Sequence, residues 1–196
     1  MDSKPPEPSD ETLMSAYVSG DRQAFERLFS RLGPRLHRFF RRSFQAEGTA
    51  DDLLQQTFLK LHKARATFKP EMRVAPWAFA IAARVRLDEF RRRKRLAEDG
   101  DEETLAKADE VQAVASANER SSTIGADTAE AVRRAVDALP ESQRVVIHLN
   151  RFEGMTFAEI ARVLGTTEGA IKLRAFRAYA TLREALAPSI AEGGLS

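Results

Sequence analysis

The stretch EGMTFAEIARVLGTTEGAIKLRAFR, residues 153–177, limits the possible folds of this chain more than any other segment does. Four apolar residues in its first half recur at the spacing of one helix face: Phe157, Ile160, Ala161 and Leu164. Gly165 suits a left-handed cap that ends this first helix, and Thr166 or Thr167 can cap a second one. Two short helices joined by a tight turn predict a helix-turn-helix, in which the second helix enters the major groove of DNA.

The expected second helix has an inward face and an outward face. The inward residues are Ile171, Ala175, Ala178 and Leu182, at spacings of four, three and four. The residues that we expect to meet DNA are Thr167, Gly169, Lys172, Leu173, Arg174, Phe176 and Arg177. The three basic side chains suit phosphates or guanine edges. Leu173 and Phe176 are unusual on such a face: they can meet thymine methyl groups in the major groove, or they can pack against another domain of the chain.

The net charge of +2 says little about nucleic acid, but the distribution of the charges says more. Residues 84–95 hold seven basic side chains against two acidic ones, whereas residues 97–130 hold ten acidic side chains against two basic ones. The chain is therefore basic where it could contact phosphate, and acidic in between.

Other function classes are limited by what the sequence lacks. Cysteine is absent from the 196 residues, which excludes disulfides, thiolate metal sites and a cysteine nucleophile. The three histidines show no ligand spacing, so we expect neither a metal nor a cofactor. Residues 1–11 lack the apolar core of a secretory signal, and the longest apolar run, residues 74–83, is far shorter than the roughly 20 residues of a membrane span. We expect a soluble, cytoplasmic protein without membrane insertion.

The apolar periodicity predicts an all-α chain of two small helical domains. The first domain spans residues 10–95, and the second, which contains the helix-turn-helix, spans residues 130–187. Between them, residues 96–129 are acidic and nearly devoid of large apolar side chains, which favours a flexible linker. The alternative for part of this segment is one solvated helix.

Within the first domain, the pattern predicts four helices. Asp21 opens the second helix, and residues 49–66 form the third. A loop of residues 67–75 follows, and a fourth helix runs from Trp77 into the arginine-rich segment.

Three blocks of the sequence, in this order, resemble bacterial RNA polymerase sigma factors of the extracytoplasmic-function (ECF) subfamily. They are DDLLQQTFLKLH (51–62), PWAFAIAARVRLDEFRRRKR (76–95) and DALPESQRVVIHLNRFEGMTFAEIARVLGTTEGAIKLRAFRA (137–178). The resemblance implies a promoter-specificity subunit that binds core RNA polymerase and directs transcription initiation, and that is not itself an enzyme. It also implies a response to a stress or envelope signal and an anti-sigma factor that holds the protein inactive.

By this resemblance, the first domain binds the clamp of core polymerase through a polar helix face. The residues of that face are Asp51, Asp52, Gln55 and Gln56. Such an acid-led stripe can meet a basic coiled coil through charge-assisted hydrogen bonds. The family usually has an acid where Gln56 stands, so either the contact is weaker here or Asp51 compensates.

The resemblance also implies that the first domain binds and opens the downstream promoter element. The residues concerned are Lys69, Arg73, Trp77, Arg84, Arg86, Arg91, Arg92 and Arg93. We expect the loop of residues 67–75 to hold an extruded base. Trp77 can serve the core or stack on a base, and Arg84 stands where the family often has asparagine, which leaves the base preference open. The second domain would read the upstream element with the helix-turn-helix and contact the polymerase flap.

Three other functions compete with this interpretation. The first is an autonomous helix-turn-helix repressor or activator, although no heptad seam for a dimer is present. The second is an enzyme, but Asp51 and Asp52 are adjacent, hence about 100° apart on a helix, and no histidine, glycine-rich loop or metal set joins them. The third is a module that binds polymerase without reading DNA, and the basic second helix argues against it.

Overall fold

The computed structural model describes residues 7–44, 46–98 and 124–193, with side chains from 130 to 187 in the last range. These ranges consist of helices and their connections, with no β-strand among them, which confirms the all-α prediction. The chain divides into two compact units, Met1–Gly100 and Asp101–Ser196, which we name unit 1 and unit 2.

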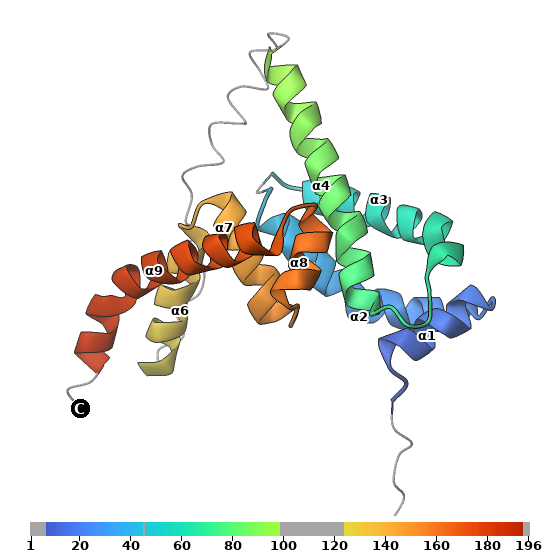
Figure 1. The fold of residues 1–196 in the computed structure, drawn as a ribbon, viewed down its shortest axis with the longest axis horizontal. Helices are drawn as coiled ribbons and strands as arrows, with labels where there is room; N and C mark the ends of the chain where they lie inside the picture. Colours follow the sequence, from blue (N-terminus) through green and yellow to red (C-terminus); the bar gives the residue numbers. More distant parts are fainter. Residues whose placement is uncertain (1–6, 45, 99–123, 194–196) are drawn as a thin grey trace, which may run out of the picture. The chain divides into compact units, whose positions relative to one another are not determined.

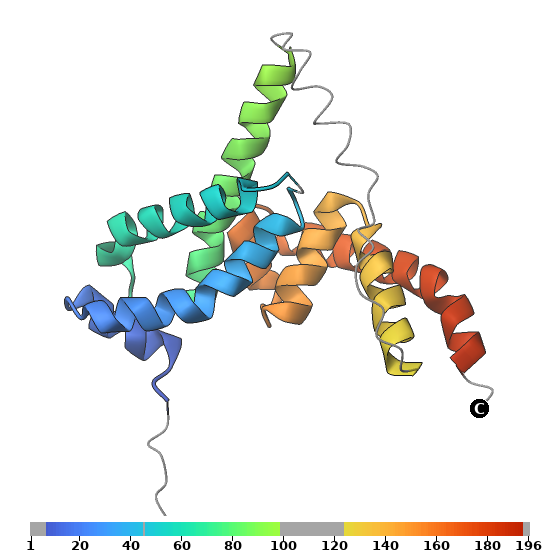
Figure 2. The ribbon, with the colours of Figure 1, turned by 180° about the vertical axis from the view of Figure 1, so that it is seen from behind.

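The described part of unit 1 contains four α-helices: α1 (Asp10–Val18), α2 (Arg22–Arg41), α3 (Thr49–Ala64) and α4 (Val74–Glu98) (Figure 1). A 3₁₀ turn, Arg65–Thr67, follows α3. Side-chain caps set the first two starts, because Ser9 Oγ accepts from Thr12 N at 3.1 Å and Asp21 Oδ1 accepts from Gln23 N at 2.8 Å. Successive helices are neighbours, and α4 also contacts α1 and α2 (Figures 1 and 2).

Phenylalanine side chains fill the centre of unit 1. Phe39 and Phe40 on α2, Phe44 just after it and Phe79 on α4 are each at most 2% exposed. The rings of Phe39 and Phe79 meet edge to face, with centroids 5.5 Å apart. Burial of each such ring contributes about 1.5–3 kcal/mol, so this cluster fixes α4 against α2.

Helix α4 begins at Val74, three residues before the predicted start at Trp77. The backbone N–H of Val74 donates to Glu11 Oε1 at 3.2 Å, so a carboxylate from α1 lies at the N-terminal end of α4, where negative charge is stabilising. Pro76 fits in this first turn because its missing N–H would have no helical partner there. The predicted loop of residues 67–75 is consequently shorter: residues 68–73 connect the 3₁₀ turn to α4.

Unit 2 is organised around its last helix. Its described elements are α6 (Ile124–Asp137), α7 (Glu141–Ile147), a π-helical turn (His148–Phe152), α8 (Phe157–Leu164) and α9 (Glu168–Gly193). Helix α9 packs against α6, α7 and α8 (Figure 1). One core cluster joins Leu139, Ile147 and Ala178, with Tyr179 and Leu182 packed on it.

The helices extend into both ends of the segment predicted as a linker. Helix α4 continues to Glu98, and α6 begins at Ile124, whereas the predicted linker spans residues 96–129. Alanine, which has the highest helix propensity of all residues, occurs in both extensions, as Ala97 in the first and as Ala126 and Ala129 in the second. The remaining residues 99–123, to which the prediction of flexibility also applied, lie outside the described residues.

Candidate functional site

The helix-turn-helix of unit 2 has the local structure predicted from its sequence. Thr156 and Glu159 form a reciprocal cap, with Glu159 N donating to Thr156 Oγ1 at 3.2 Å and Thr156 N donating to Glu159 Oε2 at 2.8 Å. Gly165 ends α8 at φ 63° and ψ 43°, the left-handed conformation that favours glycine. Thr167, not Thr166, caps α9, since its Oγ1 accepts from Ala170 N at 3.2 Å. The two helices are therefore joined by a turn fixed at each end by side chains or by glycine.

The faces of α9 are also those predicted. Ile171 and Ala178 are 0% exposed and Ala175 is 3% exposed, so this face belongs to the core. Gly169, Lys172, Leu173, Phe176 and Arg177 are exposed on the opposite side, together with the capping residue Thr167, and Arg174 is half-buried at the edge. The ammonium of Lys172 lies 2.8 Å from Glu168 Oε1 in an exposed ion pair, which contributes little to stability.

A polar stripe runs along the exposed side of α3. Asp52, Gln55 and Gln56 are exposed, whereas Leu53, Phe58 and Leu61 are buried on the other side. Leu59 lies one turn further along the same side of α3 and is 54% exposed. The sequence did not single out this leucine as part of the site, although its spacing from Asp52 places it on the same helix face. Asp51 is exposed as well, and its Oδ1 lies 3.3 Å from Nε2 of His37 on α2.

The arginines of α4 fall into two groups. Arg84, Arg91 and Arg92 are exposed, whereas Arg86 and Arg93 are half-buried. The guanidinium of Arg86 lies over the rings of Phe39 and Phe90, at 5.6 and 5.4 Å from their centroids, and donates to Ser43 Oγ at 3.2 Å. Arg86 thus packs α4 against α2, a role that its position in a basic run did not indicate.

Glu89 organises the C-terminal half of this basic run. It is 9% exposed and accepts hydrogen bonds from Nε and Nη2 of Arg92, both at 2.8 Å, and from Nε of Arg93 at 2.7 Å. Burial by itself would raise the pKa of Glu89, but the hydrogen bonds and positive charges of the two arginines outweigh it and hold the pKa below its ordinary value. Arg93 also donates to Thr49 Oγ1 at 3.1 Å and covers the Phe44 ring at 4.8 Å, so it binds the start of α3.

The connection between the 3₁₀ turn and α4 carries the remaining predicted DNA contacts. Lys69 and Arg73 are exposed on it. Trp77, in the first turns of α4, is half-buried, and its ring meets the buried Phe68 edge to face at 5.3 Å between centroids. Trp77 therefore packs on the connection and remains partly accessible to solvent.

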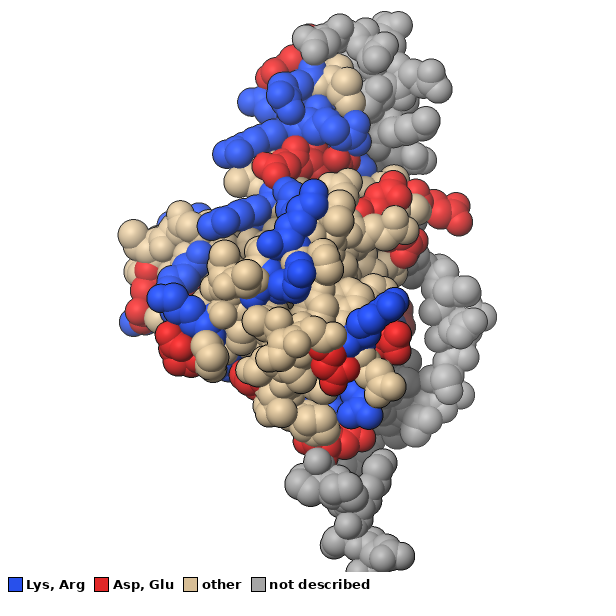
Figure 3. Space-filling model, turned by 90° about the vertical axis from the view of Figure 1, so that its right-hand side faces the viewer, with Lys and Arg blue, Asp and Glu red and all other residues tan. Residues whose placement is uncertain are grey.

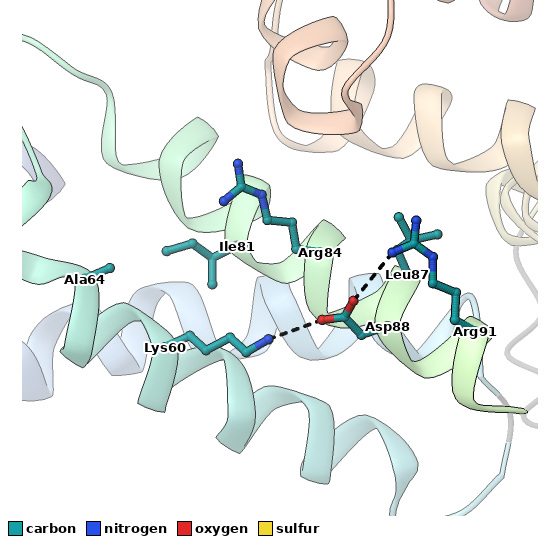
Figure 4. Close-up of a pocket in the computed structure, with 7 residues that line it drawn as sticks. All are labelled: Lys60, Ala64, Ile81, Arg84, Leu87, Asp88 and Arg91. Carbon is teal, nitrogen blue, oxygen red and sulfur yellow. Dashed lines mark hydrogen bonds and ion pairs between the residues drawn. The ribbon is translucent and has the colours of Figure 1, made fainter.

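A concave site of about 440 Å³ lies between α3 and α4. Its apolar lining comes from Ala64, Ile81 and Leu87, and its polar lining from Lys60, Arg84, Asp88 and Arg91 (Figure 4). Lys60 reaches from α3 towards Asp88 on α4, with Nζ 3.4 Å from Oδ2. The site depends on how two helices pack, so no single stretch of sequence could have indicated it.

Basic side chains gather on the surface around this part of unit 1. Figure 3 shows lysines and arginines grouped towards the C-terminal end of α4, with acidic side chains among them. The exposed members on α4 are Arg84, Arg91, Arg92, Lys94 and Arg95. In the described ranges, no group of three or more potential ligands could hold a metal ion, and no helix is long and apolar enough to cross a membrane.

The fold and these surfaces define a DNA-binding class of protein, with a helix-turn-helix unit and a second helical unit that carries a basic helix. Residues 28–96 match the family model for sigma-70 region 2, and residues 129–182 match the model for sigma-70 region 4. The chain is 36% identical to the ECF RNA polymerase sigma factor SigM of Mycobacterium tuberculosis (strain ATCC 25618 / H37Rv) over 180 residues, which cover 92% of this chain and 86% of the relative. It is 33% identical to the RNA polymerase sigma factor CarQ of Myxococcus xanthus over 177 residues, 88% of this chain and 95% of the relative.

Solved structures give the same fold. The structure of CnrH in complex with the cytosolic domain of CnrY aligns with a TM-score of 0.61 and 27% identity, over 92% of this chain and 99% of that one. The sigma factor RpoE of Bartonella quintana, solved with the anti-sigma factor NepR, aligns with a TM-score of 0.64 and 24% identity, over 83% and 96%. The chain belongs to the ECF RNA polymerase sigma factors, a family of transcription regulators rather than enzymes.

Proposed function

We propose that this sigma factor divides its work between two units: unit 1 binds core polymerase and opens the downstream promoter element, and unit 2 reads the upstream element and contacts the polymerase flap. Its membership of the ECF sigma factors supports this assignment. The observation that carries it is the placement of the charged faces. An acid-led stripe on α3, a basic helix α4 and a basic outward face on α9 all point to solvent from well-packed helices. Such a protein acts in the cytoplasm, where core polymerase and the chromosome are.

The stripe on α3 is the proposed contact for the polymerase clamp. Asp52, Gln55 and Gln56 offer one carboxylate and two amides along one helix face, and Leu59 adds an apolar end to it. Carboxylates and amides pair well with a basic helix, and an exposed leucine beside them adds apolar area to the contact. Asp51, beside His37, lies at the edge of this face and supplies a second negative charge.

The basic helix α4 and the connection before it are the proposed contact for the downstream element. Arg84, Arg91 and Arg92 are exposed and suit the phosphates of a strand that passes over α4. Arg86 and Arg93 contribute by holding α4 in place, in addition to any phosphate contact. Lys69, Arg73 and the accessible part of Trp77 suit an unstacked base, because aromatic rings beside cations bind bases by stacking.

An anti-sigma factor is the proposed regulator. Two structural relatives were solved as complexes, CnrH with the cytosolic domain of CnrY and RpoE with the anti-sigma factor NepR. Exposed leucines on α3 and α4, Leu59 and Leu87, are 54% and 46% exposed and offer apolar anchors for such a partner. A stress or envelope signal would then release the sigma factor to core polymerase.

Run-off transcription tests the proposal. Purified protein is mixed with core polymerase and with genomic promoter fragments, including the one upstream of its own gene. We expect the protein alone to bind promoter duplex weakly, and core polymerase to convert this into specific initiation, because two DNA-binding units on one enzyme act at high effective concentration. Absence of stimulation on every fragment, or tight specific binding without polymerase, would reject the proposal in favour of an autonomous regulator or another module.

A further inference from the structure

The outward face of α9 has a central stripe that cannot form hydrogen bonds through side chains. Its members are Gly169, Leu173 and Phe176, each three or four residues from the next. Leu173 is 49% exposed and Phe176 is 72% exposed, the highest exposure of any large apolar residue described. A face that reads DNA only through donors and acceptors would not place its least polar residues at the centre.

Gly169 adds an independent observation. A methyl group at this position would have no neighbour within 4 Å, so packing inside the chain does not require glycine there. Glycine within a helix is nevertheless less favourable than alanine. Gly169 lies in the first turn of α9. In a helix-turn-helix, this N-terminal end is the part of the recognition helix that approaches the bases most closely. Its smallness is explained if another molecule comes close to the backbone there.

The charges on either side of the stripe indicate the kind of molecule. Lys172 and Arg177 are exposed beside Leu173 and Phe176, and Arg174 is half-buried at the edge. A major groove has phosphates along both walls and base edges on its floor. On that floor thymine offers a methyl group, which prefers apolar contact. Cations at the sides and an apolar centre therefore match DNA that has thymine at the contacted positions.

We propose that Leu173 and Phe176 read thymine methyl groups in the upstream promoter element, with Gly169 allowing the close approach that this requires. The inference rests on the proposed function, because it names what the helix-turn-helix recognises. It commits the two apolar residues to DNA and not to a protein surface. Specificity at these positions comes from shape and apolar contact, while the basic side chains hold the phosphates.

Replacement of thymine by deoxyuridine tests this directly, because it removes the methyl group and leaves base pairing intact. The probes are synthetic duplexes of a promoter on which the holoenzyme initiates, with each upstream thymine replaced in turn. We expect wild-type holoenzyme to bind about three- to fivefold more weakly at one or two positions, the effect of losing one buried methyl group. Leu173→Ser and Phe176→Ser should bind the thymine duplex more weakly and should no longer distinguish uracil at the position each one reads.

Val132→Ser is the matched control, since Val132 is a 40% exposed apolar residue on α6 of the same unit. It should keep the wild-type ratio between thymine and uracil duplexes. Melting curves should be alike for all three variants, because each changes an exposed side chain. The inference is overturned if the wild type binds thymine and uracil duplexes equally at every position. It is also overturned if Leu173→Ser and Phe176→Ser both keep the wild-type ratio between the two duplexes, even where these variants lose binding to an inhibitor protein instead. A holoenzyme that binds no promoter specifically fails earlier and rejects the proposed function itself.

Discussion

Glu89 Oε1 and Arg93 Nε lie 2.7 Å apart, one helical turn from each other on α4, in a pair that also reaches Thr49 at the start of α3. The pair places a nearly buried carboxylate beneath a run of basic residues. Without it, the positive charges of Arg92 and Arg93 would repel each other and their neighbours. Glu89, which the basic side chains cover, therefore stabilises the arrangement of arginines on this surface of unit 1.

This arrangement predicts how the stability of unit 1 depends on pH. The pKa of Glu89 is lowered from its ordinary value of 4.5, so its contribution to folding is complete above that value and is lost as the pH falls through the lower, folded-state pKa. Glu89→Gln should lower the free energy of unfolding by about 1–3 kcal/mol at pH 7. Calorimetry of the full chain should show that the difference in stability between Glu89→Gln and the wild type becomes smaller as the pH falls below 4.5.

Asp88→Asn provides the comparison for Glu89→Gln. Asp88 is exposed and its ion pair with Lys60 is 3.4 Å long, so the substitution should change stability by no more than about 0.5 kcal/mol. Equal losses in the two variants, or a Glu89→Gln difference that does not change between pH 7 and pH 3, would contradict the account of Glu89.

Arg91 and Arg93 are expected to differ in function although only one residue separates them. The Arg91 side chain is 67% exposed and that of Arg93 is 26% exposed. Arg91→Ala should reduce the salt dependence of holoenzyme binding to promoter DNA by about one phosphate contact and leave stability unchanged. Arg93→Ala should lower the melting temperature of the full chain, because it removes a partner of Glu89 and the cover of Phe44. The same salt slope in Arg91→Ala as in the wild type would remove Arg91 from the proposed interface.

The helix-turn-helix could be predicted almost residue by residue, because its signals are local. The two capping residues Thr156 and Glu159 are only three residues apart, and the left-handed cap at Gly165 depends only on the φ angle of that residue. The inward positions of α9 follow from helical spacing. The start of α4 could not be predicted in this way. The carboxylate that receives the Val74 N–H belongs to Glu11, which is remote in sequence.

The separate roles of the arginines in the basic run could not be predicted from the sequence either. From sequence, Arg86 and Arg93 are indistinguishable from Arg91, since all three belong to one cationic segment. The structure separates them because Phe39, Phe44 and Phe90 provide rings for two of the guanidinium groups and not for the third. Such a distinction depends on how α4 packs on α2, which charge patterning does not contain.

The clamp contact proposed for α3 predicts effects of opposite sign at two neighbouring positions. Asp52→Arg reverses a charge on the exposed stripe and should weaken binding to core polymerase by about 1–3 kcal/mol, as like charges meet. Gln56→Glu supplies the acid that most of the family is expected to have and should strengthen it. Competition for core polymerase against a labelled sigma factor measures both. Glu26→Arg, the same charge change at an exposed position of α2 outside this stripe, is the control; if it weakens binding as much as Asp52→Arg, net charge and not this face determines affinity.

Ile171 and Arg177 should separate the folding role of α9 from its DNA-binding role. Ile171 is 0% exposed, so Ile171→Ala should lower the stability of unit 2 by about 2–5 kcal/mol through loss of buried contacts. Arg177→Ala should leave stability unchanged and either relax discrimination at one upstream position by ~1–3 kcal/mol or weaken all sequences alike with a smaller salt slope. Melting curves and promoter competition distinguish these outcomes. If Arg177→Ala unfolds the unit while Ile171→Ala changes only promoter choice, the orientation assigned to α9 is wrong.

Gly169→Ala should make the protein more stable and a poorer reader of its promoter. The added methyl group meets no other part of the chain within 4 Å beyond the adjacent helix backbone, and alanine is favoured over glycine in a helix by at most roughly 0.5–1 kcal/mol, so the melting temperature of unit 2 should rise. The same methyl group would separate the first turn of α9 from the base edges and weaken holoenzyme binding by ~1–3 kcal/mol, the range for one lost base contact. Binding to a promoter with a scrambled upstream element should not change, because no close approach is made there. A variant that is more stable and binds the intact promoter as tightly as the wild type would show that Gly169 does not lie against DNA.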